Sequence, residues 1–480
     1  MPLPISNPDG HVTGRRGPRL GCLACLSLGV LLVGGARPAA ANSADLFGVG
    51  PRYGAMGDAA AALAIGPAAA FYNPAGVAAG KGAELHFASL AYAGWLRVRD
   101  EVRSIENPYE FSLGLTVPVP FKGILGERIW LGLLLMAHPD IVARVISHLP
   151  TDPFYPYFDN RSQRVVLLPT LAARLLDHPR AGRLTLGVGL NVFAGLTGVI
   201  LGQEGASRAL EARVSQALGG LIRLSAGLRY DWRWLHLGLT YRQQFSMPFR
   251  TDSFNFVAGA DLNLNVDAEG LFSPHTLVLG LGATPSERLT VGLDFGYALW
   301  RTYRGPYVRV SSLLPLVGEL TGDVPRLDFR DALGVRAGVE YRAPLPKGLV
   351  LPLRLGLGFE SSPVPEQPGR TNMLDGHKLM LSAGVGLDFG RLLGRRVWVD
   401  LHLRLHALVP RMFEKRISTP AEECPASRPP LGLDQALGDE VPCDRTNDET
   451  LGLQISNPGY PRLRASGFVL SGGFGLGVEL

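Results

Sequence analysis

The side chains that could carry out chemistry in this sequence are few, and their spacing argues against catalysis. His402 and His406 are four residues apart in a segment that alternates apolar and polar residues. In a strand their Cα atoms would be about 13 Å apart, so the two imidazoles cannot chelate one metal ion. The sequence has neither a G-x-S-x-G nucleophile motif nor an H-E-x-x-H zinc motif. We therefore predict no enzyme, no catalytic or metal site and no cofactor; the enzymatic alternative is a lipase-like Ser–His pair that only folding would bring together.

The first 41 residues are predicted to be a cleavable export signal. Arg15, Arg16 and Arg19 form a basic region, Leu20–Gly35 is apolar, and a run of three alanines ends at Ala41. Cleavage there takes four arginines and one aspartate from totals of 47 basic and 42 acidic residues, which leaves 43 and 41. A mature chain so close to neutral gives no reason to expect a nucleic-acid partner.

Two further groups of residues could bind ligands in the exported chain. Gly48-Val49-Gly50 superficially resembles a phosphate-binding loop, but no strand precedes it and no βαβ unit follows. Cys424 and Cys443 remain after the signal is removed. In an oxidising compartment a single disulfide between them is the natural interpretation, and two free thiols or a metal-binding pair are the alternatives.

The elements that must position these residues are strands rather than helices. Hydrophobic residues make up 46% of the chain, yet the longest uncharged apolar runs after the signal, Ile129–Ala137 and Val165–Ala173, have about half of the ~20 residues that a spanning helix needs. Apolar and polar residues alternate with period two in Thr290–Trp300, Lys378–Phe389 and Val397–Ala407. Across eight such segments the apolar face carries no charge, as is typical of strands that face lipid.

The polar face of these strands distinguishes a barrel from a soluble β-sandwich. It is rich in glycine and in charged residues of both signs. We predict that these charges pair along each strand, Arg336 with Glu340, Arg354 with Glu360, and Asp400 with Arg404. A sandwich would bury its apolar face and expose Lys, Thr and Ser instead. Charges that can pair favour a water-filled or plugged lumen.

Connection lengths then predict the topology. Fourteen strands, from 83–97 to 466–480, are joined by alternately short and long links, as in bacterial outer-membrane barrels with short periplasmic turns and long outer loops. Residues 246–273 also alternate weakly, so sixteen strands is the alternative. The last strand ends in Leu480 rather than the more usual aromatic residue. The predicted fold class is all-β, a transmembrane antiparallel β-barrel of about 14 strands in the bacterial outer membrane, multi-pass, with an N-terminal hatch inside the lumen.

The segment before the first strand has a different composition. Residues 42–82 are rich in Gly and Ala, lack the alternation, and contain FYNPAG at Phe71–Gly76. A segment this poor in strand or long-helix signals is expected to fold inside the barrel as a plug. The predicted organisation is therefore a signal peptide at 1–41, an N-terminal hatch at 42–82 and a barrel with long outer loops at 83–480.

At this point the sequence resembles the FadL-type long-chain fatty-acid transporters, also called outer membrane protein transport proteins. The resemblance covers nearly the whole mature chain and is carried by GVGPRYGAMGDAAAALAIGPAAAFYNPAG (Gly48–Gly76), LTVGLDFGYALW (Leu289–Trp300), LDFRDALGVRAGVEYR (Leu327–Arg342) and LRLGLGFESSPVPE (Leu353–Glu366). It implies a fourteen-stranded barrel closed by a hatch, with hydrophobic ligands entering from outside and leaving sideways. The chain departs from the family pattern in its long 410–463 loop and its Ala-rich hatch.

Three sets of residues are candidates for ligand contact. In the hatch they are Met56, Leu63, Phe71, Tyr72, Asn73 and Pro74, where shaping the backbone turn is favoured over ligand contact for Asn73 and Pro74. In the outer loops they are Leu196, Val199, Ile200, Leu201, Leu210, Phe254 and Phe256, which either form an apolar capture groove or pack on each other to stiffen the rim. In the strand 129–138 they are Trp130, Gly132, Leu134 and Met136, which either line a lateral exit with a kink at Gly132 or contact the hatch.

The predicted function is outer-membrane uptake of hydrophobic small molecules such as long-chain fatty acids, by capture at the outer loops, passage past the hatch and lateral exit. The expected partners are a hydrophobic small molecule (a fatty acid or a hydrocarbon) and outer-membrane lipid, and the barrel is expected to be a monomer. The alternatives are an outer-membrane scaffold for secretion or surface attachment, which would bind a partner protein, and a general porin.

Overall fold

The computed structural model describes residues 43–98, 101–105, 109–123, 126–139, 153–158, 165–204, 210–257, 260–305, 309–314, 318–321, 327–367, 371–392, 394–414 and 462–480. These residues belong to one compact unit that spans Pro38–Leu480. The predicted signal peptide and the predicted Cys424–Cys443 disulfide lie outside the described residues.

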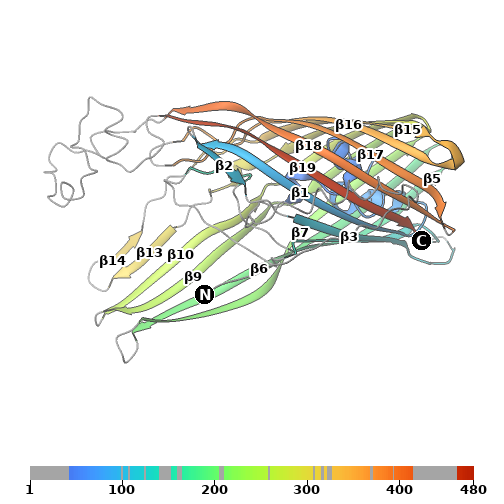
Figure 1. Cartoon of the computed structure of the whole chain (residues 1–480). Helices are drawn as coiled ribbons and strands as arrows, with labels where there is room; N and C mark the ends of the chain where they lie inside the picture. The colour runs from blue at the N-terminus through green and yellow to red at the C-terminus, as the bar shows by residue number, and fades with distance from the viewer. Residues whose placement is uncertain are drawn as a thin grey trace, which may run out of the picture. The chain divides into compact units, whose positions relative to one another are not determined.

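Fourteen antiparallel strands form a closed wall (Figure 1). Each pairs with the next in the order β1, β3, β4, β5, β6, β7, β8, β11, β12, β15, β16, β17, β18 and β19, and β19 returns to β1 with Glu479 opposite Glu84. The wall strands are β1 (Glu84–Val98), β3 (Tyr109–Pro118), β4 (Ile129–Ala137), β5 (Val166–His178), β6 (Gly182–Glu204), β7 (Leu210–Trp232), β8 (Leu235–Arg242), β11 (Thr276–Ser286), β12 (Leu289–Ala298), β15 (Ala332–Pro344), β16 (Val350–Glu360), β17 (Lys378–Leu392), β18 (Arg395–Glu414) and β19 (Arg462–Glu479). The predicted fourteen-stranded barrel is confirmed.

The sixteen-strand alternative is excluded, because β8 pairs directly with β11. The residues between them form β9 (Phe245–Val257) and β10 (Ala260–Ser273), which pair with each other outside the wall. The remaining strands also lie in the connections at the long-loop end: β2 (Glu101–Ile105), β13 (Arg309–Leu314) and β14 (Gly318–Thr321).

The sequence placed Leu196 to Leu210 in an outer loop, but paired strands occupy most of this segment. β6 continues to Glu204 and β7 begins at Leu210, and the two strands stay in register throughout. Continuous cross-strand pairing keeps the two strands together well beyond the point where the loop was expected.

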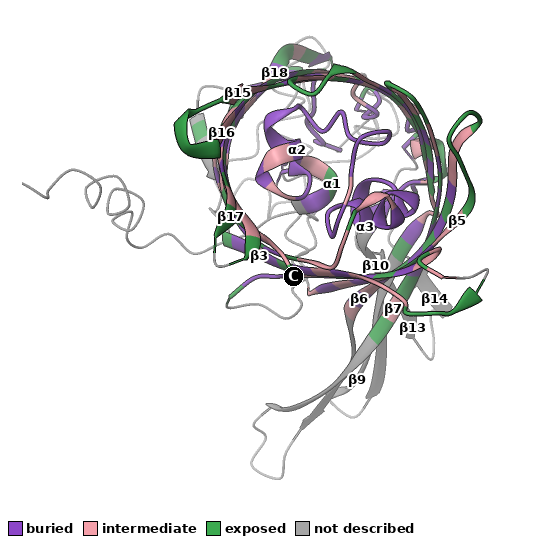
Figure 2. Cartoon of the chain, turned by 90° about the vertical axis from the view of Figure 1, so that its right-hand side faces the viewer, coloured by how far each residue is buried: buried purple, intermediate pink, exposed green. Residues whose placement is uncertain are grey.

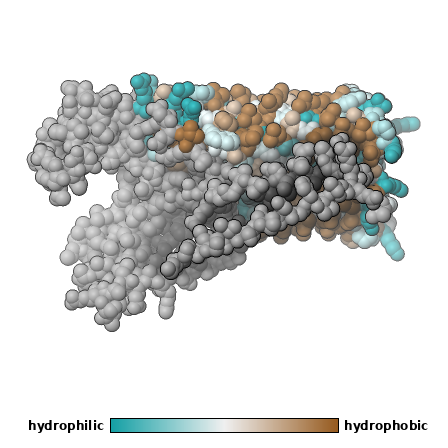
Figure 3. All heavy atoms as spheres, viewed as in Figure 1, coloured by the Kyte–Doolittle hydropathy of each residue, from teal (hydrophilic) through white to brown (hydrophobic). Residues whose placement is uncertain are grey.

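The outward face of the wall is apolar. On β16, Leu353, Leu355 and Leu357 are 45%, 59% and 60% exposed, whereas Arg354 between them faces inward and is 5% exposed. Such residues form a hydrophobic band on the part of the barrel that Figure 3 shows in colour. Water-soluble proteins do not expose apolar surface on this scale, and a lipid bilayer covers it without cost. No helix among the described residues is long and apolar enough to cross a membrane.

The N-terminal segment (Ser43–Gly80) lies inside the ring of strands (Figure 2). It contains four short helices, α1 (Ser43–Phe47), α2 (Pro51–Ala55), α3 (Ala69–Tyr72) and the 3-10 helix η1 (Pro74–Ala79). Most of its residues are buried. Two more 3-10 helices, η3 (Trp300–Thr302) and η4 (Pro346–Gly348), lie in connections between wall strands.

Candidate functional site

The N-terminal segment is seated on glycines of the wall. A Cβ added to Gly338 would lie 2.2 Å from the carbonyl oxygen of Met56, and one added to Gly356 would lie 2.1 Å from the amide nitrogen of Gly57. The same holds for Gly187, where the added atom would lie 2.2 Å from the carbonyl carbon of Pro74. Wall positions without side chains therefore let the backbone of the segment touch the backbone of the strands.

Asn73 holds the fold of the N-terminal segment, which is the role that the sequence favoured for it over ligand contact. Its side-chain amide donates to the carbonyl oxygens of Ala61 (2.7 Å) and of Leu228 on β7 (3.0 Å). Its side-chain oxygen accepts from the amide of Ala75 at 3.1 Å and caps η1. Asn73 is completely buried, and both its side-chain nitrogen and its side-chain oxygen have hydrogen-bond partners, so its role is structural.

Arg404 of β18 fastens the N-terminal segment to the wall. Its guanidinium donates to both carboxylate oxygens of Asp58 (2.7 and 2.9 Å) and to the carbonyl oxygens of Phe47 and Gly54 (2.7 Å each). Tyr72 donates a further hydrogen bond of 2.6 Å to Asp58. Burial and the Asp58 carboxylate raise the pKa of Tyr72 well above its ordinary value, so this hydroxyl remains a donor.

The predicted charge pairs within single strands were wrong. Glu340 accepts from Arg354 (2.6 Å) and from Arg52 of α2 (2.9 Å), and Arg354 also binds Asp400 at 2.6 Å. Residues four apart on a strand are about 13 Å apart, whereas facing residues of adjacent strands are about 5 Å apart. The partners are therefore found across strands and in the N-terminal segment. Arg336 pairs with Glu360.

A chamber of about 110 Å³ lies on the long-loop side of the N-terminal segment; we call it the outer chamber. Its wall is partly aromatic, with Phe71, Tyr72, Tyr157 and Trp300 among the lining residues. Each arginine that lines it has a carboxylate partner, since Arg242 lies 3.4 Å from Asp45 and Arg336 lies 3.4 Å from Glu360. Asp45 also lies 3.7 Å from Arg223, and Glu360 lies 3.6 Å from Lys378, so each carboxylate is shared between two cations.

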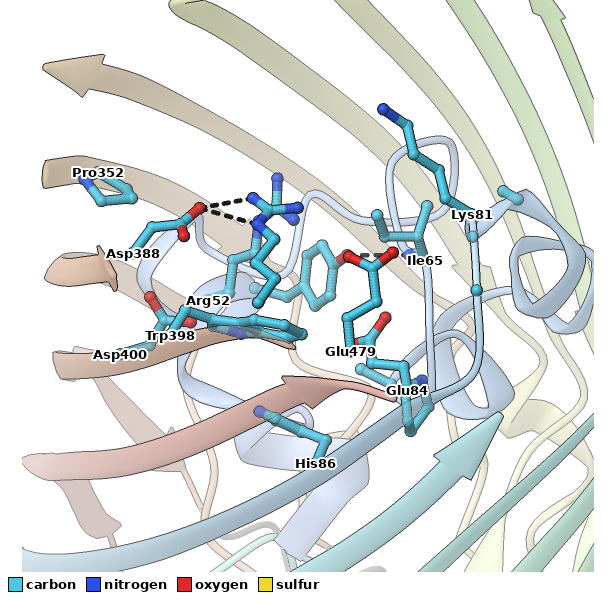
Figure 4. Close-up of a pocket in the computed structure, with 18 of the residues that line it drawn as sticks. Arg52, Ile65, Lys81, Glu84, His86, Pro352, Asp388, Trp398, Asp400 and Glu479 are labelled. Carbon is cyan, nitrogen blue, oxygen red and sulfur yellow. Dashed lines mark hydrogen bonds and ion pairs between the residues drawn. The ribbon is translucent and has the colours of Figure 1, made fainter. Parts of the chain in front are cut away.

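A second chamber, of about 180 Å³, lies on the short-turn side (Figure 4); we call it the inner chamber. It is lined by charged residues that include Arg52, Glu84, Asp388 and Glu479, together with the ring of Trp398. Among these, Asp388 accepts from Arg396 and Arg342. The N-terminal segment therefore lies between two chambers that both have aromatic and charged lining residues, the outer one including Asp45, Asp58, Asp294 and Glu360.

The long-loop end of the barrel carries an aromatic layer. Tyr155, in the connection between β4 and β5, bonds to the backbone of Arg97 on β1 and of Ser466 on β19. Phe154 pairs through its backbone with Asn372 and Leu374 of the β16–β17 connection. Both aromatic side chains belong to one buried cluster that also contains Phe47 of the N-terminal segment.

The predicted exit residues on β4 face the lumen and are covered. Trp130, Leu134 and Met136 are at most 2% exposed and share a hydrophobic cluster with Val77 and Ala78 of the N-terminal segment. The predicted kink at Gly132 is absent, because the pairing of β4 with β3 and with β5 runs through this position without a register shift. Val77 fills the space beside Gly132, since an added Cβ would lie 3.0 Å from its Cγ2.

The wall is interrupted one strand further on, at Pro169 of β5. The pairing of β5 with β6 omits Leu168 and Pro169, whereas the pairing of β5 with β4 includes both. Proline has no N–H to donate and is usually excluded from the interior of a sheet. An apolar pocket of about 630 Å³ opens outward here, lined by residues of β3 to β7 that include Pro169, Gly132, Thr170 and Gly189. We call it the wall pocket.

The other predicted site residues are placed as follows. Phe71 and Tyr72 line the outer chamber, whereas Met56 and Leu63 face the wall, where Leu63 lies against Gly282 and Gly292. The backbones of β6 and β9 pair in parallel, Leu201 opposite Phe254, so the two outer segments adjoin. The side chains proposed for the capture groove, Leu196, Val199, Ile200, Leu201, Leu210, Phe254 and Phe256, lie outside the described residues.

Sequence reasoning missed the roles of Arg404, Asp58 and Pro169. Pro169 could have been found, because a proline inside an apolar strand segment marks an interruption. Arg404 was assigned to Asp400 on its own strand, and the sequence carries no signal that would have joined it to Asp58. His402 and His406 face the lumen and are buried, as expected for its polar side. Among the described residues, no group of three or more His, Cys, Asp or Glu is placed to hold a metal ion.

The chain is similar to known proteins at the level of solved structures. No protein-family model matches the chain, and no curated protein matches it in sequence. The crystal structure of a Pseudomonas aeruginosa FadL homologue matches with a TM-score of 0.54 at 11% identity, over 93% of this chain and 99% of that one. The P. putida toluene transporter TodX matches with a TM-score of 0.50 at 14% identity, over 90% and 99% of the two chains. A TodX mutant described as a monoaromatic hydrocarbon channel gives 0.52 at 15% identity, over 91% and 100%.

At these identities the similarity concerns the fold: this chain is a closed β-barrel of the architecture found in a FadL homologue and in a toluene transporter.

Proposed function

We propose that the protein is an outer-membrane channel for the uptake of hydrophobic small molecules. The observation that carries this proposal is the division of the lumen. The N-terminal segment fills the middle of the barrel and acts as the hatch, with a partly aromatic chamber on the side of the long loops. A general porin would leave a water-filled channel instead. The similar solved structures, a FadL homologue and a toluene transporter, support the same class of cargo.

The outer chamber favours a compact, neutral ligand over a long-chain acid. Its two arginines already face Asp45 and Glu360, and Asp58 and Asp294 also line it, so a ligand carboxylate would meet more acids than arginines. Its volume of about 110 Å³ is close to the ~150 Å³ of an apolar cavity that holds benzene. Long-chain fatty acids remain the other ligand class, and capture would then depend on the outer segments around β6 and β9.

The test is uptake by proteoliposomes that contain the purified full-length protein. We expect faster entry of toluene than into empty vesicles, and weaker or no stimulation for hexadecanoate. Mass spectrometry of small molecules extracted from the purified barrel gives a second readout. Equal rates for both compounds with and without protein would exclude the channel function, and stimulation by hexadecanoate alone would reverse the assignment of the ligand.

We propose that the ligand leaves the lumen through the wall pocket at Pro169 rather than at a kink beside Gly132. The pocket is almost wholly apolar and reaches wall positions that face inward, at Gly132, Thr170 and Gly189. Val77 of the N-terminal segment lies directly behind Gly132. A small movement of η1 away from the wall would therefore join the lumen to the pocket.

Restoring a backbone donor at this position is expected to close the exit. In Pro169→Val the new N–H can complete the pairing of β5 with β6, so toluene uptake should fall severalfold while the barrel keeps its thermal stability. Pro352→Val, in a strand on another part of the wall, is the matched control and should transport normally. Unchanged uptake in Pro169→Val would show that the ligand leaves elsewhere.

A scaffold for a partner protein is the second candidate. The observation that favours it is the set of strands beyond the wall, where β6 and β9 pair in parallel and β10 pairs with β13. A stoichiometric protein partner that co-purifies with the barrel, together with toluene uptake no faster than in empty vesicles, would favour this function over transport.

A further inference from the structure

The six connections at the short-turn end form a ring of exposed positive charge. Each of them carries a cation in contact with solvent. Together with the residue that follows the N-terminal segment, the exposed cations are Lys81, Lys122, Arg180, Arg233, Arg288, Lys347, Arg391 and Arg395. The exposed acids among the described residues of the same connections are Glu127, Asp177 and Glu287. Asp177 already pairs with Arg183 at 3.2 Å, so cations dominate this end; we call the set of eight the basic rim.

Two neighbouring connections of the basic rim are held in a fixed arrangement. The Trp232 indole nitrogen donates to the carbonyl oxygen of Arg180 at 3.2 Å, and the Tyr230 hydroxyl donates to that of Ala181 at 2.7 Å. The guanidinium of Arg233 lies 5.1 Å from the centre of the Trp232 ring. The Trp232 indole therefore holds the backbone of Arg180, and the Arg233 guanidinium lies over the same ring.

Two cations of the rim occupy backbone positions that suit glycine better. Arg233 and Lys347 have φ values of 53° and 63°, in the left-handed region that side chains other than glycine seldom adopt. The chain nevertheless has a long cationic side chain at both places, in two separate turns. Glu127, in a third short connection, has a φ of 58°, so this backbone conformation is a property of the tight turns rather than of the cations.

The basic rim borders the apolar outer face of the wall. Trp232 and Trp234 are 38% and 51% exposed, and Leu345 and Leu392 in two other connections are 36% and 53% exposed. Hydrophilic side chains project beyond the apolar band at this end of the barrel (Figure 3). Exposed tryptophan next to Arg and Lys is the arrangement that anchors proteins at a membrane interface.

We propose that the basic rim binds the headgroups of anionic phospholipids, such as phosphatidylglycerol, in the leaflet next to the short turns. The phosphodiester of each lipid accepts hydrogen bonds from Arg or Lys, and its net negative charge is attracted by the ring as a whole. Lipid fits better than an acidic protein because the cations occur in all six connections. A lipid annulus meets the whole circumference, whereas a docked protein would meet one side.

The test counts lipids bound to the purified full-length protein by native mass spectrometry, with phosphatidylglycerol and phosphatidylcholine added in equal amounts. The variant Arg180→Gln/Arg233→Gln/Lys347→Gln removes three cations of the rim. The matched control, Arg301→Gln/Arg304→Gln/Arg330→Gln, removes three exposed arginines at the long-loop end. Circular dichroism establishes that both variants keep the barrel.

We expect the unaltered protein and the control to prefer phosphatidylglycerol by at least about threefold, and high salt to reduce the preference. The rim variant should lose most of it. Equal binding of the two lipids by the unaltered protein, or equal losses in both variants, would overturn the proposal. Retention of an acidic protein by the unaltered barrel but not by the rim variant, without any lipid preference, would do so too and would identify a protein partner instead.

Discussion

Replacement of Arg404 by methionine is expected to release the N-terminal segment from the barrel wall. The methionine keeps most of the side-chain volume but loses four hydrogen bonds to Phe47, Gly54 and Asp58. It also leaves Asp58 buried without its cation, which typically costs about 3–5 kcal/mol. The barrel wall itself, held by the pairing of fourteen strands, should persist. Single-channel recording in a planar bilayer should therefore show ion currents that the unaltered protein lacks.

The double variant Arg404→Met/Asp58→Asn separates the lost contacts from the buried charge. Removing the carboxylate relieves the uncompensated charge, so we expect a smaller loss of thermal stability and smaller currents than in the single variant. If Arg404→Met stayed as closed and as stable as the unaltered protein, the guanidinium would not be what holds the segment in the lumen.

The second large effect is expected from Gly338→Val, which fills the seat of the N-terminal segment. A Cβ at this position would lie 2.2 Å from the carbonyl oxygen of Met56 and 2.7 Å from its Cβ. Backbone atoms cannot yield as a flexible side chain can, so the segment must move. We expect a loss of about 1–3 kcal/mol in the stability of the closed state. It would be measured as an ion current and as a lower temperature at which heating releases the N-terminal segment from the wall.

Gly334→Val is the matched control for this experiment. Gly334 lies four residues away on the same strand and the same face, and the atom nearest to an added Cβ is 3.8 Å distant, in ordinary contact. Its current and stability should remain close to those of the unaltered protein. Equal effects at the two positions would mean that any side chain on this face disturbs the barrel. The contact between Gly338 and Met56 would then not be what holds the segment closed.

The wall of the barrel could be predicted because its cause is local. On β16, Leu353 and Leu355 point outward while Arg354 points inward, and this depends only on the two-residue period of a strand. The lengths of the connections then indicated fourteen strands. The weak alternation of 246–273 left two counts open, and β8 pairing directly with β11 decided between them.

The charge network could not be predicted from the same information. Glu340 binds Arg52, which is 288 residues away in the chain, and Arg404 binds Asp58 over a separation of 346 residues. Such partners meet because strand register and the position of the N-terminal segment bring them into the same layer of the lumen. Proximity along a strand is a poor guide, since neighbours on one face are separated by two residue lengths or more.

The sequence by itself therefore determined that about fourteen strands alternate an apolar and a polar face, and that a strandless Gly- and Ala-rich segment precedes them. It also established that the chain contains neither a G-x-S-x-G nor an H-E-x-x-H motif. Only the tertiary structure decided which glycines seat Met56 and Gly57, which carboxylate Arg404 binds, and that the strand pairing beside the wall pocket is interrupted at Pro169 and continuous at Gly132. The physical reason is the distance along the chain over which each feature is set. A repeating pattern records the environment of each residue one at a time, whereas contacts across a closed barrel depend on the register of many strands at once.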